Sequence, residues 1–223
     1  MAKQKTAYVC GECGADFSKW QGQCSDCGQW NTISEFKVGK PSAPRNARFE
    51  GYAGKLSEVQ ALDNINLEEQ SRFTSGIGEF GRVLGGGLVP GSAILIGGSP
   101  GAGKSTLLLQ TMCYLAGSMP ALYITGEESL QQVAMRATRL GIKTNNLQML
   151  SETNVESIIA AAQKMQPKVL VVDSIQVVHM EGIESAPGSV SQVRESAAML
   201  TRYAKQTGTV LFLVGHVTKE GSI

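Results

Sequence analysis

The 223-residue chain is predicted to be an α/β protein in which a mainly parallel sheet, covered by helices, follows a small metal-binding module. Three observations support this prediction. Short apolar runs alternate with helical segments between residues 93 and 214. A glycine-rich loop joins the first apolar run to the next helix, and two C-x-x-C pairs lie near the N-terminus. Continuous apolar strands separated by helices are typical of a parallel sheet that is buried on both faces.

The expected core elements can be placed from apolar runs and local end signals. Ser129 and Gln132 have the spacing of a capping box, Asn154 is a helix N-cap, and Gly208 is a C-terminal stop. The stretch 72–91 leads into the first strand, and its three consecutive glycines at 85–87 are expected to form a flexible turn. The expected strands span 93–97, 121–125, 147–150, 168–173 and 209–214, and the expected helices span 106–116, 129–140, 154–165 and 191–207.

The loop Gly98–Ser105 fits the pattern G-x-x-x-x-G-K-[ST], which cradles the phosphates of nucleoside triphosphates. The motif requires a strand before it and a helix after it, and both are expected here. Its glycines allow several backbone N–H groups to face one anion, and the helix N-terminus adds partial positive charge. The predicted ATP-binding residues are Gly98, Ser99, Pro100, Gly101, Ala102, Gly103, Lys104, Ser105 and Thr106.

Two side chains of this loop have predicted chemical roles. Lys104 is expected to reach the β- and γ-phosphates, and Ser105 is expected to bind Mg²⁺. The alternative is a chance glycine-rich turn. Such a turn would not need lysine and serine in register between a strand and a helix, so we predict ATP and Mg²⁺ as cofactors.

Polar residues follow the expected strands, at the sheet edge where parallel sheets bind ligands. Asp173 is predicted to position Mg²⁺ together with Ser105; the alternative is a cap of the strand end. Glu127 or Glu128 is expected to orient or deprotonate the attacking water. Alternatively, both are first-turn carboxylates that favour the dipole of the next helix. His216 follows the last strand, as part of the site or as a hydrogen-bonded surface group.

The two C-x-x-C pairs are predicted to bind one Zn²⁺ through Cys10, Cys13, Cys24 and Cys27. Four thiolates suit tetrahedral zinc, and a site without an open position is typically structural. Two disulfides are the alternative, which the expected cytoplasmic compartment disfavours. The apolar cover of so small a module is expected from the aromatic residues in or beside the cysteine pairs, Tyr8, Phe17, Trp20 and Trp30. The fifth cysteine, Cys113, is expected to be a buried apolar residue.

Composition sets the domain plan and restricts the partners. We expect a zinc module at 1–36, a mildly basic linker at 37–58 and an ATPase core at 59–223. The formal net charge of +1 gives no overall attraction to nucleic acid, so DNA binding would need local patches. We see no signal peptide and no apolar run of membrane-spanning length. A cytoplasmic protein without membrane contact is therefore expected.

Taken together, these motifs closely resemble the bacterial RadA family (also called Sms). The resemblance depends on the Cys10–Cys27 module, the phosphate loop, the run Tyr123–Ser129, the Val-Val-Asp-Ser run ending at Ser174, and the Gly-His-Val-Thr-Lys-Glu-Gly run ending at Gly221. It covers essentially the whole chain. Within the RecA-like superfamily, the chain is also similar to KaiC and to DnaB-type helicases.

The resemblance implies a RecA-like ATPase that is stimulated by single-stranded or branched DNA. It implies a role in homologous recombination and DNA repair, where branch migration with the RecA recombinase processes recombination intermediates. It also implies a hexameric ring with ATP between subunits. By carry-over, Glu127 is the first choice for the catalytic glutamate, His216 senses the γ-phosphate, and the glycine- and serine-rich segment 181–192 is a flexible loop that lines the channel. In that loop, Ser189 and Ser191, with Arg194 nearby, are expected to contact phosphates.

The chain departs from the family by ending at Ile223. The family continues with further strands, a Lys-Asn-Arg-Phe-Gly motif and a domain that resembles the Lon protease fold. We therefore expect an N-terminal fragment with weak hydrolysis and weak or absent ring assembly, because the missing motif would act like an arginine finger. Two alternatives remain at this point: a KaiC-like signalling ATPase, and a zinc interaction module switched by ATP that does not act on DNA.

Overall fold

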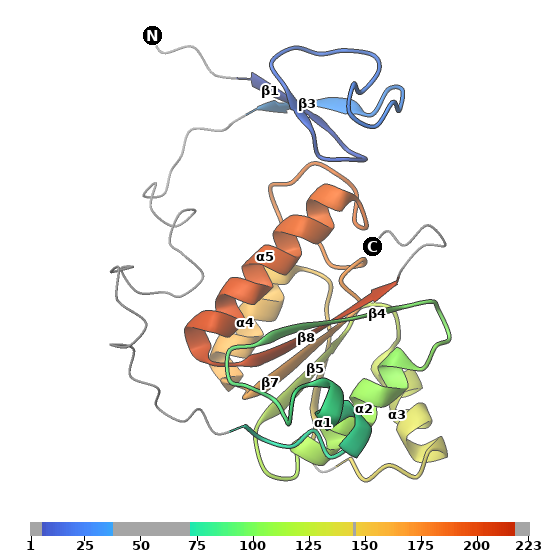
Figure 1. Cartoon of the computed structure of the whole chain (residues 1–223), viewed down its shortest axis with the longest axis vertical. Helices are drawn as coiled ribbons and strands as arrows, with labels where there is room; N and C mark the ends of the chain where they lie inside the picture. Colours follow the sequence, from blue (N-terminus) through green and yellow to red (C-terminus); the bar gives the residue numbers. More distant parts are fainter. Residues whose placement is uncertain (1–5, 38–71, 145, 217–223) are drawn as a thin grey trace.

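The structure is a computed structural model and describes residues 6–37, 72–144 and 146–216 (Figure 1). Most of the predicted linker and the residues after His216, including the rest of the run that ends at Gly221, lie outside these ranges. The described residues form a small antiparallel sheet near the N-terminus and a larger parallel sheet with helices. No helix in these ranges is both long enough and apolar enough to cross a membrane.

The N-terminal sheet contains β1 (Thr6–Cys10), β2 (Asp16–Phe17) and β3 (Ile33–Lys37), in the order β2-β1-β3. Each C-x-x-C pair is followed by a tight turn, and the two turns are of the same kind. Gly14 and Gly28 have φ angles of 76° and 73°, and their N–H groups donate to the carbonyl oxygens of Cys10 and Cys24. Glycine adopts this left-handed conformation at no steric cost, so each pair presents its two thiols on one side of a turn.

The core sheet has five parallel strands in the order β4-β8-β7-β5-β6. The bounds are Ala93–Gly98 for β4, Ala121–Thr125 for β5, Gln148–Ser151 for β6, Val169–Asp173 for β7 and Val210–His216 for β8. The predicted mainly parallel sheet is confirmed. Because β8 lies between β4 and β7, the end of β8 lies between the phosphate loop after β4 and the acidic residue at the end of β7.

Helices cover both faces of this sheet (Figure 1). On one face, α4 (Val155–Met165) and α5 (Val190–Thr207) bury alternate strand residues such as Leu122, Leu170 and Leu211. On the other face, α1 (Gly78–Val83) and α2 (Lys104–Leu115) bury the intervening residues, such as Tyr123 and Phe212. The helix α3 (Leu130–Arg139) packs on α2 through Val133 and Ala137. Strand residues thus alternate between two apolar cores.

Local end signals are confirmed where they were predicted. The Ser129–Gln132 capping box forms with both of its hydrogen bonds, Asn154 caps α4, and Gly208 ends α5 with a φ of 71°. The helix α2 begins at Lys104, two residues earlier than expected. These signals are reliable because each depends on hydrogen bonds between residues at most four positions apart.

The three glycines at 85–87 lie in a non-helical turn, as expected, but the residues before them form a helix that was not predicted. Residues 78–83 form the short helix α1, whose Phe80 packs against Phe212 with ring centroids 5.9 Å apart. The glycine run that follows is held by a two-way backbone pairing of Phe73 with Leu88. A Cβ on Gly87 would lie 2.9 Å from the Phe73 carbonyl oxygen, so glycine is needed there for close approach as well as for its φ of 140°. The helix was missed because a distant apolar partner stabilises it.

Candidate functional site

The phosphate loop occupies the turn between β4 and α2. Gly103 is the N-cap of α2 in a left-handed conformation, with a φ of 87°, and no side chain caps this helix end. The first N–H groups of a helix have no intrahelical partner, and together with the helix dipole they favour an anion. The end of α2 therefore keeps its donors for a phosphate, as the motif predicts.

Lys104 lies inside this loop and is only 8% exposed. Its Nζ donates to the carbonyl oxygens of Gly98 at 2.7 Å and Ser99 at 2.9 Å, and it lies 3.2 Å from Nδ1 of His216. All three of these partner atoms carry no formal negative charge when the imidazole is neutral. A buried ammonium held by neutral groups is stabilised further by an anion, so the loop fits the phosphates of ATP.

A cavity of about 200 Å³ opens beside the loop. A cavity of this size suits phosphate groups rather than a whole nucleotide. A second hollow, of about 370 Å³, lies at the other end of the sheet near Lys168 and Tyr203 and includes none of the predicted site residues. The residues lining the smaller cavity are Gly101, Gly103, Lys104, Ser105, Thr106, Glu128, Arg136 and His216.

Glu127 lies beside the ends of β7 and β8. Its Oε1 accepts a hydrogen bond from the Ser174 hydroxyl and lies 3.2 Å from Nε2 of His216. Because Lys104 donates to Nδ1 of the same ring, a neutral imidazole carries its proton on Nε2 and donates it to Glu127. Glu127 and His216 are thus brought together with Lys104.

Glu128 takes a different direction. Its Oε2 accepts from the Arg136 guanidinium of α3, and its backbone N–H and C=O both pair with the Thr125 hydroxyl. Sequence reasoning left the two glutamates as alternatives, and the structure separates them. Glu127 has a serine and a histidine as partners, whereas Glu128 is half of an ion pair at the cavity wall. Arg136 and Ser174 were not predicted, because both gain their roles from residues distant in sequence.

Asp173 ends β7 and accepts a hydrogen bond of 2.5 Å from the Tyr123 hydroxyl on the neighbouring strand β5. Burial, and then the charge of Asp173, raise the pKa of Tyr123 far above its ordinary value, so the phenol remains a donor. This bond fixes the orientation of the carboxylate at the carboxyl end of the sheet. A carboxylate there is suited to accept hydrogen bonds from the water molecules that surround a Mg²⁺ ion.

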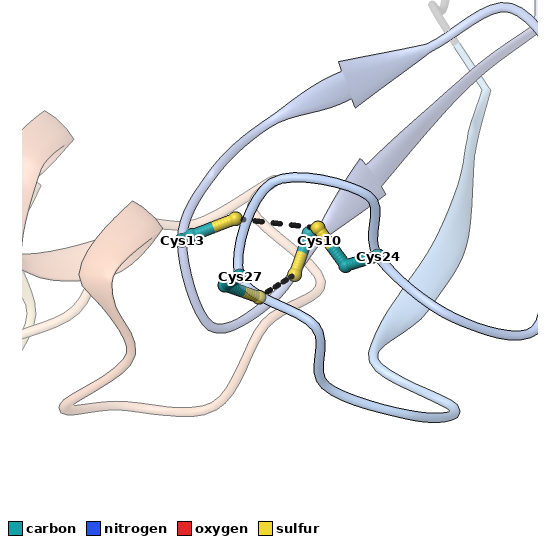
Figure 2. A group of neighbouring side chains, drawn as sticks. All are labelled: Cys10, Cys13, Cys24 and Cys27. Atoms are coloured by element: carbon teal, nitrogen blue, oxygen red, sulfur yellow. Dashed lines mark hydrogen bonds between the residues drawn. The ribbon is translucent and has the colours of Figure 1, made fainter.

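The four predicted zinc ligands converge on one point (Figure 2). Their Sγ atoms all lie within 4.8 Å of one another, with 3.7 Å between Cys10 and Cys27 and 3.5 Å between Cys13 and Cys24. Tetrahedral zinc with bonds of about 2.3 Å would separate its sulfur ligands by about 3.8 Å. None of the four is in a disulfide, so the alternative of two disulfides is wrong. The donor set fits Zn²⁺.

The electrostatics of this cluster also fit a cation. Burial raises the pKa of Cys10, but hydrogen bonds from the Thr32 hydroxyl and from nearby backbone N–H groups outweigh it and lower the value to about 6. The pKa of Cys13 is raised to about 12: a backbone N–H favours its thiolate, but burial and the neighbouring thiols outweigh that effect. Four thiolates so close together repel one another, and a dication removes that repulsion.

The predicted aromatic cover of the zinc module is correct for two residues and wrong for two. Tyr8 and Phe17 pack on the small core of Cys10, Cys24 and Ile33. Trp20 and Trp30 are 59% and 67% exposed and lie against Gly22 instead. Cys113 is buried between α2 and α3, as predicted.

The expected flexible loop at 181–192 is shorter than predicted and tied to the core. Ser189 caps α5, so Ser191 and Gln192 are helical. The buried Gln192 side chain accepts from the Met180 N–H and donates to the carbonyl oxygens of Ile183 and Ser185. Residues 180–193 contain two glutamates and no lysine or arginine. Arg194, expected to contact phosphates, forms an exposed ion pair with Glu195 at 3.3 Å.

Two family models match the chain. The AAA domain model matches residues 77–222, and the rubredoxin metal binding domain model matches residues 8–35. The second match covers all four cysteines, in agreement with the geometry of the thiol cluster. The first covers the phosphate loop and every polar residue described around it.

Curated relatives are similar along the whole chain. The DNA repair protein RadA of Salmonella typhimurium is 63% identical over 227 residues, that of Escherichia coli 62% over 227 and that of Bacillus subtilis 51% over 224. Each alignment covers 100% of this chain and 49% of the relative, so the chain spans about half the length of the curated relatives it matches. Among solved structures, a KaiC-like protein from Pyrococcus horikoshii has a TM-score of 0.58 at 21% identity, covering 69% of this chain and 74% of that chain, and shows the same fold.

Proposed function

The chain belongs to the AAA domain family, and on this premise we propose that it hydrolyses ATP at the phosphate loop as a DNA-stimulated ATPase of DNA repair. One observation carries the proposal. The His216 ring contacts both Lys104 and Glu127 at 3.2 Å, beside the N-terminus of α2, which no side chain caps. This links the cation that binds phosphate to a carboxylate that can accept a proton from water. The names of the curated relatives add the setting of DNA repair.

In this proposal, bound ATP supplies the γ-phosphoryl group and Mg²⁺ neutralises its charge. Lys104 leaves the Gly98 and Ser99 carbonyls to bind the β- and γ-phosphates, while the N–H groups of the loop hold their oxygens. Ser105 and Asp173 would hold the Mg²⁺ that accompanies ATP. The Tyr123 hydroxyl keeps Asp173 in a fixed orientation. Little covalent chemistry is required, since phosphoryl transfer depends mainly on positioning and on charge.

Glu127 is proposed to orient the attacking water and accept its proton. The Ser174 hydroxyl and the His216 ring hold its carboxylate on two sides. When Lys104 moves to the phosphates, His216 loses its contact to Nζ and is free to sense the γ-phosphate. The Gln176 side chain donates to the His216 carbonyl oxygen at 3.1 Å and keeps the backbone of β8 in place meanwhile.

The partners and the assembly are proposed from the resemblance described in the sequence analysis. We propose that the protein acts on single-stranded or branched DNA, with the RecA recombinase, by branch migration of recombination intermediates, and that it works as a hexameric ring. The acidic 180–189 loop offers no basic side chain for a DNA strand. Contacts of DNA with that loop would therefore use backbone N–H and serine hydroxyl groups. Separately, ATP hydrolysis by this chain alone is expected to be weak.

The test is ATP hydrolysis by the 223-residue chain and by a full-length relative, with and without single-stranded DNA, across a salt series. Stimulation that decreases as salt rises would support DNA coupling, because phosphate contacts release counterions. Robust hydrolysis that is indifferent to DNA in both proteins would contradict it. That result would favour a KaiC-like signalling ATPase or a zinc interaction module switched by ATP.

A further inference from the structure

Arg136 lies on α3, outside the phosphate loop, yet it contributes to the wall of the same cavity as Lys104 and Ser105. Its side chain is only 15% exposed, although much of α3 faces solvent. Arg139, one turn further along the helix, is exposed. The burial of the Arg136 side chain is therefore specific to this residue and is not shared by the helix as a whole.

Three local contacts fix where the guanidinium lies. The capping box of Ser129 and Gln132 sets the start of α3, and the Thr125 hydroxyl holds the Glu128 backbone in the preceding turn. The Glu128 carboxylate then accepts a hydrogen bond from Nη2 of Arg136. An arginine has five N–H donors, and this ion pair engages one of its nitrogens. The remaining donors lie in a group that borders the cavity.

The charge and the shape of the group suit a phosphate. A planar guanidinium binds phosphate oxygens in pairs, and Lys104 is the other cation that lines the cavity. A purely structural role, in which Arg136 holds α3 against the β5 turn, would not require it to line the same cavity as Ser105 and Thr106. The two roles predict different responses to the number of phosphates on the ligand.

We propose that Arg136 is a second phosphate-binding residue of this site, contacting the terminal phosphate of a nucleoside triphosphate while Glu128 holds it in place. The inference rests on the proposed ATP site, since it specifies how that site distinguishes triphosphate from diphosphate. It also gives Glu128 the role of a positioning residue and leaves Glu127 as the base.

The experiment is calorimetric titration of the whole 223-residue chain with the non-hydrolysable triphosphate AMP-PNP and with ADP, both in the presence of Mg²⁺. Arg136→Gln is expected to weaken AMP-PNP binding about tenfold or more, the typical value of a charge-assisted hydrogen bond, and ADP binding less than about threefold. Arg136→Lys should recover part of the AMP-PNP affinity. Arg139→Gln, the matched control on the same helix, should bind both ligands like the parent.

Equal losses for both nucleotides, or no loss, would overturn the inference. Arg136→Gln leaves Glu128 without its cation, so folding is checked by thermal unfolding. The double variant Glu128→Gln/Arg136→Gln removes both charges and leaves neither unpaired; it is expected to fold and to lose the preference for triphosphate, and a preserved preference would refute the proposal. Lys104→Ala separates the two levels: if it binds both nucleotides normally, the ATP site itself is wrong.

Discussion

The His216 ring joins two of the predicted site residues, with Nδ1 3.2 Å from Lys104 Nζ and Nε2 3.2 Å from Glu127 Oε1. Strand order explains this arrangement, because β8 runs between β4 and β7 and pairs Gly98 with His216. One side chain therefore contacts both Lys104 and Glu127. The contact gives the phosphate loop and the proposed base a common structural link.

Replacing Lys104 tests the phosphate loop directly. Lys104→Ala removes the cation and its hydrogen bonds to Gly98 and Ser99, and it is expected to abolish ATP hydrolysis within the detection limit. Phosphate release in a coupled assay measures this. Lys164→Ala, an exposed lysine on α4, is the matched control and should hydrolyse ATP at the parent rate. Persistent hydrolysis by the Lys104 variant would show that the loop is not the catalytic site.

The two glutamates are expected to differ. Glu127→Gln removes the proposed base and should lower kcat by about 10²- to 10⁴-fold with little change in KM. Glu128→Gln breaks the ion pair with Arg136 and is expected to raise KM for ATP more than it lowers kcat. Steady-state kinetics of both variants with a full-length relative as reference decides this. The reverse pattern would assign the base to Glu128.

The sequence predicted features that depend on neighbours in the chain. The phosphate loop, the C-x-x-C pairs and the caps at Ser129, Asn154 and Gly208 each follow from residue type and spacing within a few positions. The contacts that separate Glu127 from Glu128 do not. They require the register of β5 beside β7 and the fold of α3, which bring together residues that are distant in sequence. The prediction that Trp20 and Trp30 cover the zinc module was also wrong, because apolar character alone does not determine which side chains a small module buries.

Zinc is expected to be required for the N-terminal module and not for the core. Cys27→Ser removes one of the four thiolates and should release zinc, measured as metal content by mass spectrometry and as loss of module signals in NMR spectra. The affinity for nucleotide should remain within about twofold of the parent, because none of the predicted nucleotide-binding residues belongs to this module. Cys113→Ser, a buried cysteine away from the cluster, is the control for zinc content. Loss of nucleotide binding together with zinc would show that the two parts depend on each other.

Removing the Tyr123 hydroxyl tests how Asp173 is held. Tyr123→Phe deletes the hydrogen bond of 2.5 Å and should lower the free energy of unfolding by about 2 kcal/mol, the typical value for a hydrogen bond to a charged group. Urea unfolding measures this, and a rise in the Mg²⁺ concentration needed for half-maximal hydrolysis is expected as well. Tyr114→Phe, which alters a half-exposed tyrosine, should change neither quantity. Unchanged Mg²⁺ dependence in the Tyr123 variant would restrict that bond to a stabilising role.

A final prediction concerns the glycine that precedes the two glutamates. A Cβ on Gly126 would lie 2.4 Å from Cγ2 of Val177 and 3.3 Å from Cγ2 of Thr153, while the Gly126 N–H donates to the Asp173 carbonyl oxygen at 2.9 Å. Gly126→Ala should therefore destabilise the fold by about 1–3 kcal/mol, the usual cost of overpacking, and should lower kcat by displacing Glu127. Adding Val177→Ala removes the closest clashing methyl group and should restore most of both quantities. If Val177→Ala did not relieve the defect, the close approach of these two segments would not be the reason for glycine at this position.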